Sequence, residues 1–98
     1  MHETEVASRL RRASHALCAM GDIQPRLEAA YAQLSHITPE ALGGSLAVRF
    51  EELVADLTYG GDSIAEALSY MNPHDQVRLA ERIVSLYGEV CLSLAHDD

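Results

Sequence analysis

The sequence contains no tryptophan, no lysine and a single phenylalanine, Phe50. With only four tyrosines besides, the apolar core must be built mainly from Leu, Val, Ile, Ala and Met, a set of residues that suits the packing of helices. No segment alternates apolar and polar residues strictly, and the β-branched residues are scattered, so no strands are expected. These absences favour an all-α fold.

Long apolar runs are also absent. No window approaches the roughly 18 consecutive apolar residues of a membrane span, and Met1 to Glu5 lacks the basic-then-apolar order of a signal peptide. We therefore expect no membrane partner and a cytoplasmic location. In a reducing compartment Cys18 and Cys91 are expected to be buried thiols rather than a disulfide.

Positive charge is scarce, because 15 acidic residues stand against 7 basic ones and give a formal net charge of -8. Such a field repels nucleic-acid phosphates, so direct binding to DNA or RNA is not expected. It favours association with a partner that carries a basic surface. The one local cluster of positive charge, Arg9, Arg11 and Arg12, is interpreted as a solvated helix face.

Helix-start and helix-stop signals divide the chain into five segments within a single domain, 1–98. All three prolines lie at predicted helix starts, and Gly21 and the Gly60-Gly61 pair mark breaks. Because Gly43 and Gly44 weaken a helix, the regular part of the third segment is expected to begin at Ser45. The predicted helices run from Glu3 to Met20, from Pro25 to Ile37, from the Thr38-Pro39-Glu40 signal to Leu57, from Ser63 to about Met71, and from Asn72 to Leu94. We expect a small antiparallel four-helix-type bundle with an additional short helix.

The last segment, 72–94, carries the strongest helical pattern. Asn72 can cap it, Pro73 suits its first position, and Asp75 adds negative charge to its first turn. Two apolar rows follow, and we call them the first row (Val77, Ala80, Val84, Tyr87, Cys91 and Leu94) and the second row (Leu79, Ile83, Leu86 and Val90). Two rows need at least two neighbouring helices to cover them, so this helix is predicted to be the centre of the bundle.

The residues Gly60-Gly61-Asp62-Ser63-Ile64 resemble the phosphopantetheine attachment motif of acyl and peptidyl carrier proteins. The resemblance covers about five residues and implies that Ser63 is the modified residue, with Asp62 and Glu66 as acidic neighbours. The surroundings depart from that family, because the following helix is short and is ended by Asn72-Pro73. A Gly-Gly break followed by a Ser-x-x-Glu capping box accounts for the same residues without a cofactor.

No nucleophile, phosphate loop or dinucleotide fingerprint is recognisable, and no Cys-x-x-Cys or Glu-x-x-His spacing points to a metal. We therefore expect no catalytic residue, no metal and no cofactor. Glu51, Glu52 and Asp56 form an acidic face in the third segment, with Glu52 and Asp56 one turn apart. They are the candidate partner-binding residues.

The preferred functional hypothesis is a non-enzymatic protein–protein interaction module that docks on another protein. Small acidic helical proteins of this kind include adaptors, secretion chaperones and inhibitors such as anti-CRISPR, immunity or antitoxin-like proteins. The apolar residues exceed one seam, which also leaves a surface for a homodimer. The alternative is an acyl or peptidyl carrier modified on Ser63.

Overall fold

The computed structural model describes residues 3–96, with side chains for residues 5–94. It is all-helical over that range, which confirms the predicted fold class. The elements in chain order are α1 (Glu3–Leu17), α2 (Ile23–Leu34), the 3₁₀ turn η1 (Pro39–Ala41), α3 (Gly44–Leu57), α4 (Ile64–Ser69) and α5 (Pro73–His96).

The end of α1 differs from the prediction. The helix stops at Leu17 because the chain tightens there, with Cys18 N donating to His15 O and Ala19 N to Ala16 O. The Arg26 guanidinium then donates to the freed Leu17 carbonyl at 2.7 Å. Met20, which the periodicity assigns to the apolar stripe, therefore lies outside the helix and is 98% exposed.

The second and third segments also begin and end differently from their sequence signals. α2 starts at Ile23, so Pro25 is its third residue, and Ile37 is buried from the loop that follows the helix. The signal at Pro39 produces only the short turn η1, whereas α3 begins at Gly44 after Gly43 adopts a φ of 71°. The expected start of regular helix at Ser45 is therefore right to within one residue.

Both later helices have the side-chain caps that the sequence predicts. Ser63 Oγ accepts from Glu66 N at 3.1 Å at the start of α4, and Asn72 Oδ1 accepts from Asp75 N at 2.8 Å at the start of α5. α4 ends at Ser69, two residues before the expected end. α5 runs for 24 residues, or about 36 Å, close to the 42 Å length of the molecule.

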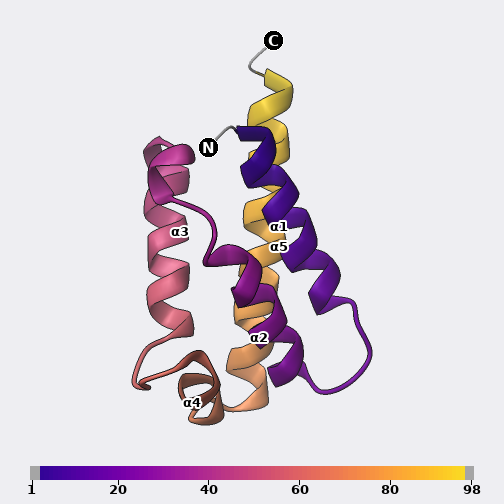
Figure 1. The fold of residues 1–98 in the computed structure, drawn as a ribbon, viewed down its shortest axis with the longest axis vertical. Helices are drawn as coiled ribbons and strands as arrows, with labels where there is room; N and C mark the ends of the chain where they lie inside the picture. Colours follow the sequence, from indigo (N-terminus) through magenta and orange to yellow (C-terminus); the bar gives the residue numbers. More distant parts are fainter. Residues whose placement is uncertain (1–2, 97–98) are drawn as a thin grey trace.

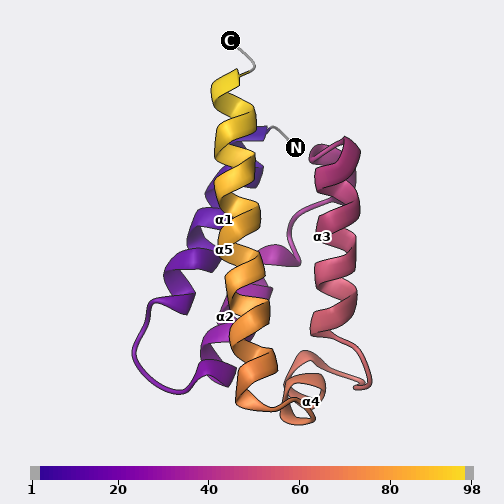
Figure 2. The same cartoon turned by 180° about the vertical axis from the view of Figure 1, so that it is seen from behind.

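The three other long helices, α1, α2 and α3, pack around α5. Figures 1 and 2 show α5 between α1 and α3, and α5 runs antiparallel to both. α2 lies next to α1, behind α5 in the view of Figure 2, and α4 lies across one end of the molecule. α1 packs most closely with α2, while α3 rests mainly on α5 and η1. The predicted central place of α5 is confirmed, because it contacts α1, α2 and α3.

The core is aliphatic apart from Phe50, as the composition predicts. It takes one stripe from each long helix, and from α5 it takes the second row only. Its buried apolar side chains include Val6, Leu10, Leu17, Leu27, Leu34, Phe50, Leu53, Leu57, Leu68, Leu79, Ile83, Leu86 and Val90. None of the helices within residues 3–96 combines the length and apolar composition that a membrane crossing requires.

Candidate functional site

The three carboxylates predicted to form a binding face all lie exposed on α3, but they do not share one groove. Glu52 lines a shallow groove between α3 and α5 together with Arg49 and Arg82. Glu51 lies on the other side of α3, where it lines an open groove with Tyr31 and other residues of the α2 side. Glu51 and Glu52 therefore face different grooves, on opposite sides of the exposed ridge of α3.

Two ion pairs join α3 to α5 and reduce the negative field at that seam. Arg82 Nη1 donates to Asp56 Oδ2 at 2.8 Å, and Arg49 pairs with Glu89. Their side chains remain 40–56% exposed, so each pair adds no more than about 1 kcal/mol to stability. Asp56 is therefore partly neutralised by a cation from α5, whereas Glu51 and Glu52 make no ion pair with any residue that the structure describes.

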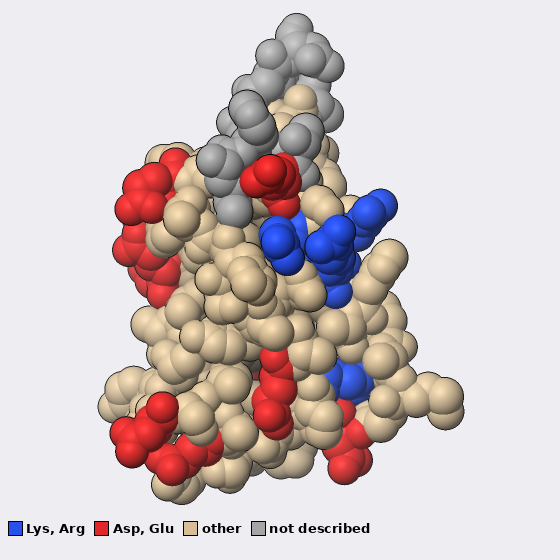
Figure 3. Space-filling model, in the orientation of Figure 1, with Lys and Arg blue, Asp and Glu red and all other residues tan. Residues whose placement is uncertain are grey.

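Charge is distributed unevenly over the molecule. The stretch from α3 through α4, residues 43–72, contains five carboxylates and only one cation, Arg49. All five are exposed: Glu51, Glu52, Asp56, Asp62 and Glu66. Figure 3 shows acidic side chains gathered on the side of α3 and at the end near α4, while most of the arginines visible in that view lie over α1. The α3–α4 side (residues 43–72) is thus the strongly acidic part of the surface.

Ser63, the residue implied by the carrier resemblance, forms a reciprocal cap. Its Oγ accepts from Glu66 N, while Glu66 Oε1 accepts from Asp62 N at 3.0 Å. The side chain is exposed at the start of α4, which has only six residues. The hydroxyl thus has a structural role in this fold, as the capping interpretation expects.

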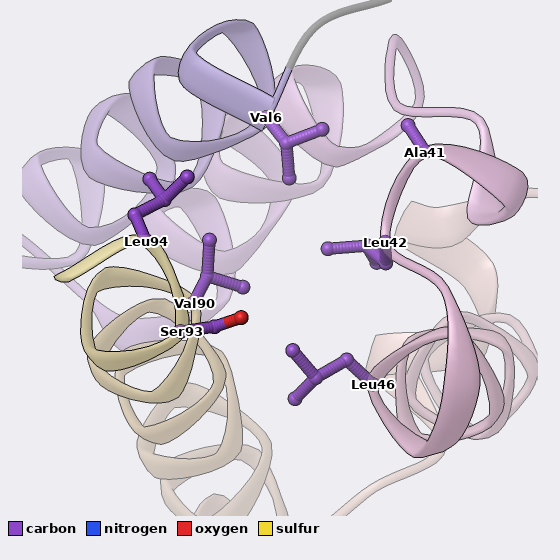
Figure 4. A pocket seen from close by; sticks show the side chains of 7 residues that line it. All are labelled: Val6, Ala41, Leu42, Leu46, Val90, Ser93 and Leu94. Atoms are coloured by element: carbon purple, nitrogen blue, oxygen red, sulfur yellow. The ribbon is translucent and has the colours of Figure 1, made fainter. Parts of the chain in front are cut away.

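One small, partly open pocket among the described residues has too little room for a ligand. Figure 4 shows the cavity at the end where α1 begins and α5 ends, lined by Val6, Ala41, Leu42, Leu46, Val90, Ser93 and Leu94. Its volume is about 10 Å³, close to the minimum for one water molecule, and all but one of its lining side chains are apolar. This cavity offers neither the space nor the polar groups of a small-molecule site.

The two cysteines contradict the expectation of buried thiols, since both are exposed and unbonded. Cys18 lies just beyond the end of α1, and Cys91 belongs to the first row of α5. The pKa of the Tyr87 phenol is raised, first by a hydrogen bond with the Cys91 side chain one turn further along α5. No cluster of three His, Cys, Asp or Glu side chains that could hold a metal occurs among the described residues.

The sequence did not reveal that the first row of α5 is incompletely covered. Val77 and Val84 are 45% and 48% exposed, and they border an open groove of about 560 Å³ between α1 and α5. We call it the α1–α5 groove, and its lining residues are Ser14, Leu17, Cys18, Ile23, Arg26, Val77, Ala80, Glu81, Val84 and Ser85. The signal was present in the strict 3-4-3-4-3 spacing of the first row, which is the spacing of a helix–helix seam.

Comparison with known proteins gives no relative for this arrangement: no family model, no curated protein and no solved structure matches the chain.

Proposed function

We propose that this protein is a non-enzymatic docking module that binds a partner with a basic surface through its α3–α4 side. The observation that carries the proposal is the unequal distribution of charge, with five exposed carboxylates and one arginine in residues 43–72. Arg49 pairs with Glu89 and Arg82 of α5 pairs with Asp56, so four of the five carboxylates make no ion pair with a described residue and the side carries a net negative charge. Such a surface raises the rate at which a cationic partner associates and repels acidic ones.

Glu51 and Glu52 are the principal attracting groups in this proposal. Both are exposed on the ridge of α3, and neither is neutralised by a described ion pair. Asp56 contributes less because Arg82 lies 2.8 Å from its carboxylate. Arg82 is itself exposed, so a carboxylate on the partner can compete for it and free Asp56 for a basic group.

Docking fits the shape of the molecule better than catalysis does. The hollows along α3 are open to the surface, and the mostly apolar pocket where α1 begins and α5 ends has a volume of only about 10 Å³. A catalytic site needs a nucleophile, a base and an orienting group that meet in a pocket. Open grooves of this kind suit contact with the surface of another protein, which is why we propose binding.

The test is an affinity capture that compares two variants of equal net charge. Glu51→Lys/Glu52→Lys reverses the unpaired charges of α3, whereas Glu5→Lys/Glu28→Lys makes the same charge change on α1 and α2. A specific partner in extracts of cells that naturally contain the chain should be retained by the wild type and the control pair. The variant Glu51→Lys/Glu52→Lys should fail to retain the partner, and raised salt should weaken capture of the partner by the wild type.

The purified partner then allows the rates to be measured. We expect the α3 variant to slow association by about tenfold or more at low salt and to flatten its salt dependence, as electrostatic steering requires. Equal binding by both double variants would contradict the proposed surface. Absence of any captured protein that depends on the chain would contradict the docking function itself.

A further inference from the structure

The open groove that Glu51 borders lies between α2 and α3, two helices that contact each other only sparsely. The segment that joins them crosses from one helix to the other and closes part of this space (Figure 1). The volume of the groove is about 400 Å³, within the range of roughly 300–1,000 Å³ of ligand pockets. We call it the α2–α3 groove, and its lining residues include Tyr31, Leu34, Ile37, Phe50, Glu51 and Val54.

The inside of the groove is apolar and is held in place by the core. Leu34 is fully buried, and Ile37 and Phe50 are only 5% and 3% exposed, so these three side chains form its floor. Tyr31 from α2 and Val54 from α3 are partly buried and pack against the same core. Because the core fixes these side chains in the free chain, an apolar group of a partner can enter without rearranging the helices.

Glu51 is the charged residue of this groove, and no described ion pair neutralises it. The residues three and four positions away on α3, where an intrahelical cation would have to lie, are all apolar: Ala47, Val48, Val54 and Ala55. Glu52 differs, because Arg49 and Arg82 line the groove on its side of α3. The α2–α3 groove therefore combines an apolar floor with one carboxylate that lacks a cation.

We infer that the α2–α3 groove is the specificity site of the docking function proposed above, on which this inference rests. Its occupant is a segment of the partner in which a large apolar side chain lies next to an arginine or lysine. The apolar side chain packs between Tyr31 and Val54, and the basic group pairs with Glu51. Charge complementarity selects this occupant, because a purely apolar segment would desolvate the carboxylate without pairing it, and an acidic segment would be repelled.

Selection of random 12-residue peptides displayed on phage, with the full chain immobilised, tests the chemistry of the occupant. Enriched peptides should carry a large apolar residue within one helical turn of an arginine or lysine. In a synthetic copy of an enriched peptide, replacing the basic residue by glutamine or the apolar residue by alanine should weaken binding by about tenfold. Enrichment of purely apolar or acidic peptides, or of none, would overturn the inference.

Two matched arginine substitutions locate the site. Ala55→Arg places a cation one turn from Glu51, where it can pair with the carboxylate and occupy the groove, so the synthetic peptide should bind about tenfold more weakly or worse. Ala65→Arg is the control, since it makes the same charge change at an exposed alanine of α4, one turn from Asp62 and outside the groove. It should weaken binding by less than about threefold. Equal weakening by the two variants would contradict the assigned groove.

Single neutralisations compare the two sides of α3. Glu51→Gln should weaken binding of the synthetic peptide by about three- to tenfold, because it removes the charge that the basic residue meets. Glu52→Gln removes the same charge from the opposite side and should have less than a twofold effect. Equal effects would show that the peptide senses the general field of α3 and not the groove.

Capture of the natural partner separates this inference from the docking proposal. If Ala55→Arg loses the partner while Ala65→Arg retains it, the groove is the contact. If Glu51→Lys/Glu52→Lys loses the partner but Ala55→Arg retains it, docking through the acidic surface stands and the groove inference fails. Retention of the partner by Glu51→Lys/Glu52→Lys would contradict both.

Discussion

The two apolar rows of α5 look equivalent in the sequence and have different fates in the structure. Leu79, Ile83, Leu86 and Val90 are all buried against the other helices. In the first row, Val77, Val84 and Cys91 are exposed, while Ala80, Tyr87 and Leu94 are partly covered. Helical spacing therefore identifies an apolar face, whereas the helices that pack around it decide whether that face is covered.

The physical reason lies in how many neighbours surround α5. Helices α1 and α3 lie on either side of it, and α2 lies across the core, so the second row points into the space that they enclose. The first row lies on a neighbouring face of α5, and part of it borders the open α1–α5 groove. Ala80, Tyr87 and Leu94 of this row pack against the core, whereas Val77 and Val84 are about half exposed and line the α1–α5 groove.

The largest expected difference between the rows comes from placing a charge in each. Ile83→Asp should unfold the domain or nearly so, because an unpaired buried charge costs several kcal/mol against a total stability of roughly 5–15 kcal/mol. Val84→Asp, one residue later, should leave the isolated chain folded. Circular dichroism melts of dilute protein provide the measurement. Similar melting temperatures for the two variants would show that the two rows do not differ in burial.

Truncation should separate the rows by a smaller amount. Leu86→Ala removes a buried side chain and should lower the free energy of unfolding by about 2–5 kcal/mol. Val84→Ala removes a half-exposed one and replaces it with a better helix former, so a change below about 0.5 kcal/mol is expected. Urea unfolding of dilute protein measures both. A loss at Val84 as large as that at Leu86 would show that the first row belongs to the core.

The caps of α4 and α5 lie at the end of the molecule where α5 and its two apolar rows begin. Ser63→Ala should lower the free energy of unfolding by about 0.5–2 kcal/mol, since it removes the acceptor for Glu66 N. Ser45→Ala, another exposed serine in a first helical turn, is the control and should have a smaller effect.

Ser63 also decides between capping and modification. Incubation with a phosphopantetheinyl transferase and coenzyme A should leave the intact mass of the wild type unchanged. A gain of one phosphopantetheine group on the wild type, lost in Ser63→Ala, would instead support the carrier alternative.

The smallest expected effect concerns Cys91, the thiol in the first row of α5. Cys91 and Cys18 are both free, so adding a reductant should leave the melting temperature unchanged. A scanning melt with and without reductant measures this. A clear drop in the melting temperature of the reduced sample would show that Cys18 and Cys91 form a disulfide between the end of α1 and the first row of α5.

Local signals in the sequence predicted those features of the fold that depend on neighbouring residues. The number of helices, the caps at Ser63 and Asn72 and the break at Gly60-Gly61 all follow from side chains within four residues of one another. The end of α1 could not be predicted in this way, because Leu17 O is bound by Arg26, which arrives from α2. For the same reason Met20 was wrongly assigned to the stripe.

The acidic character of the chain and the amphipathic faces of its helices follow from composition and spacing, which are properties of the sequence. Which charges remain unpaired and which apolar face remains open depends on tertiary packing. Arg82 reaches Asp56 across 26 residues, and Val77 and Val84 border the α1–α5 groove although other residues of the first row pack against the core. Both outcomes depend on which helices become neighbours in space, and no local pattern encodes that choice.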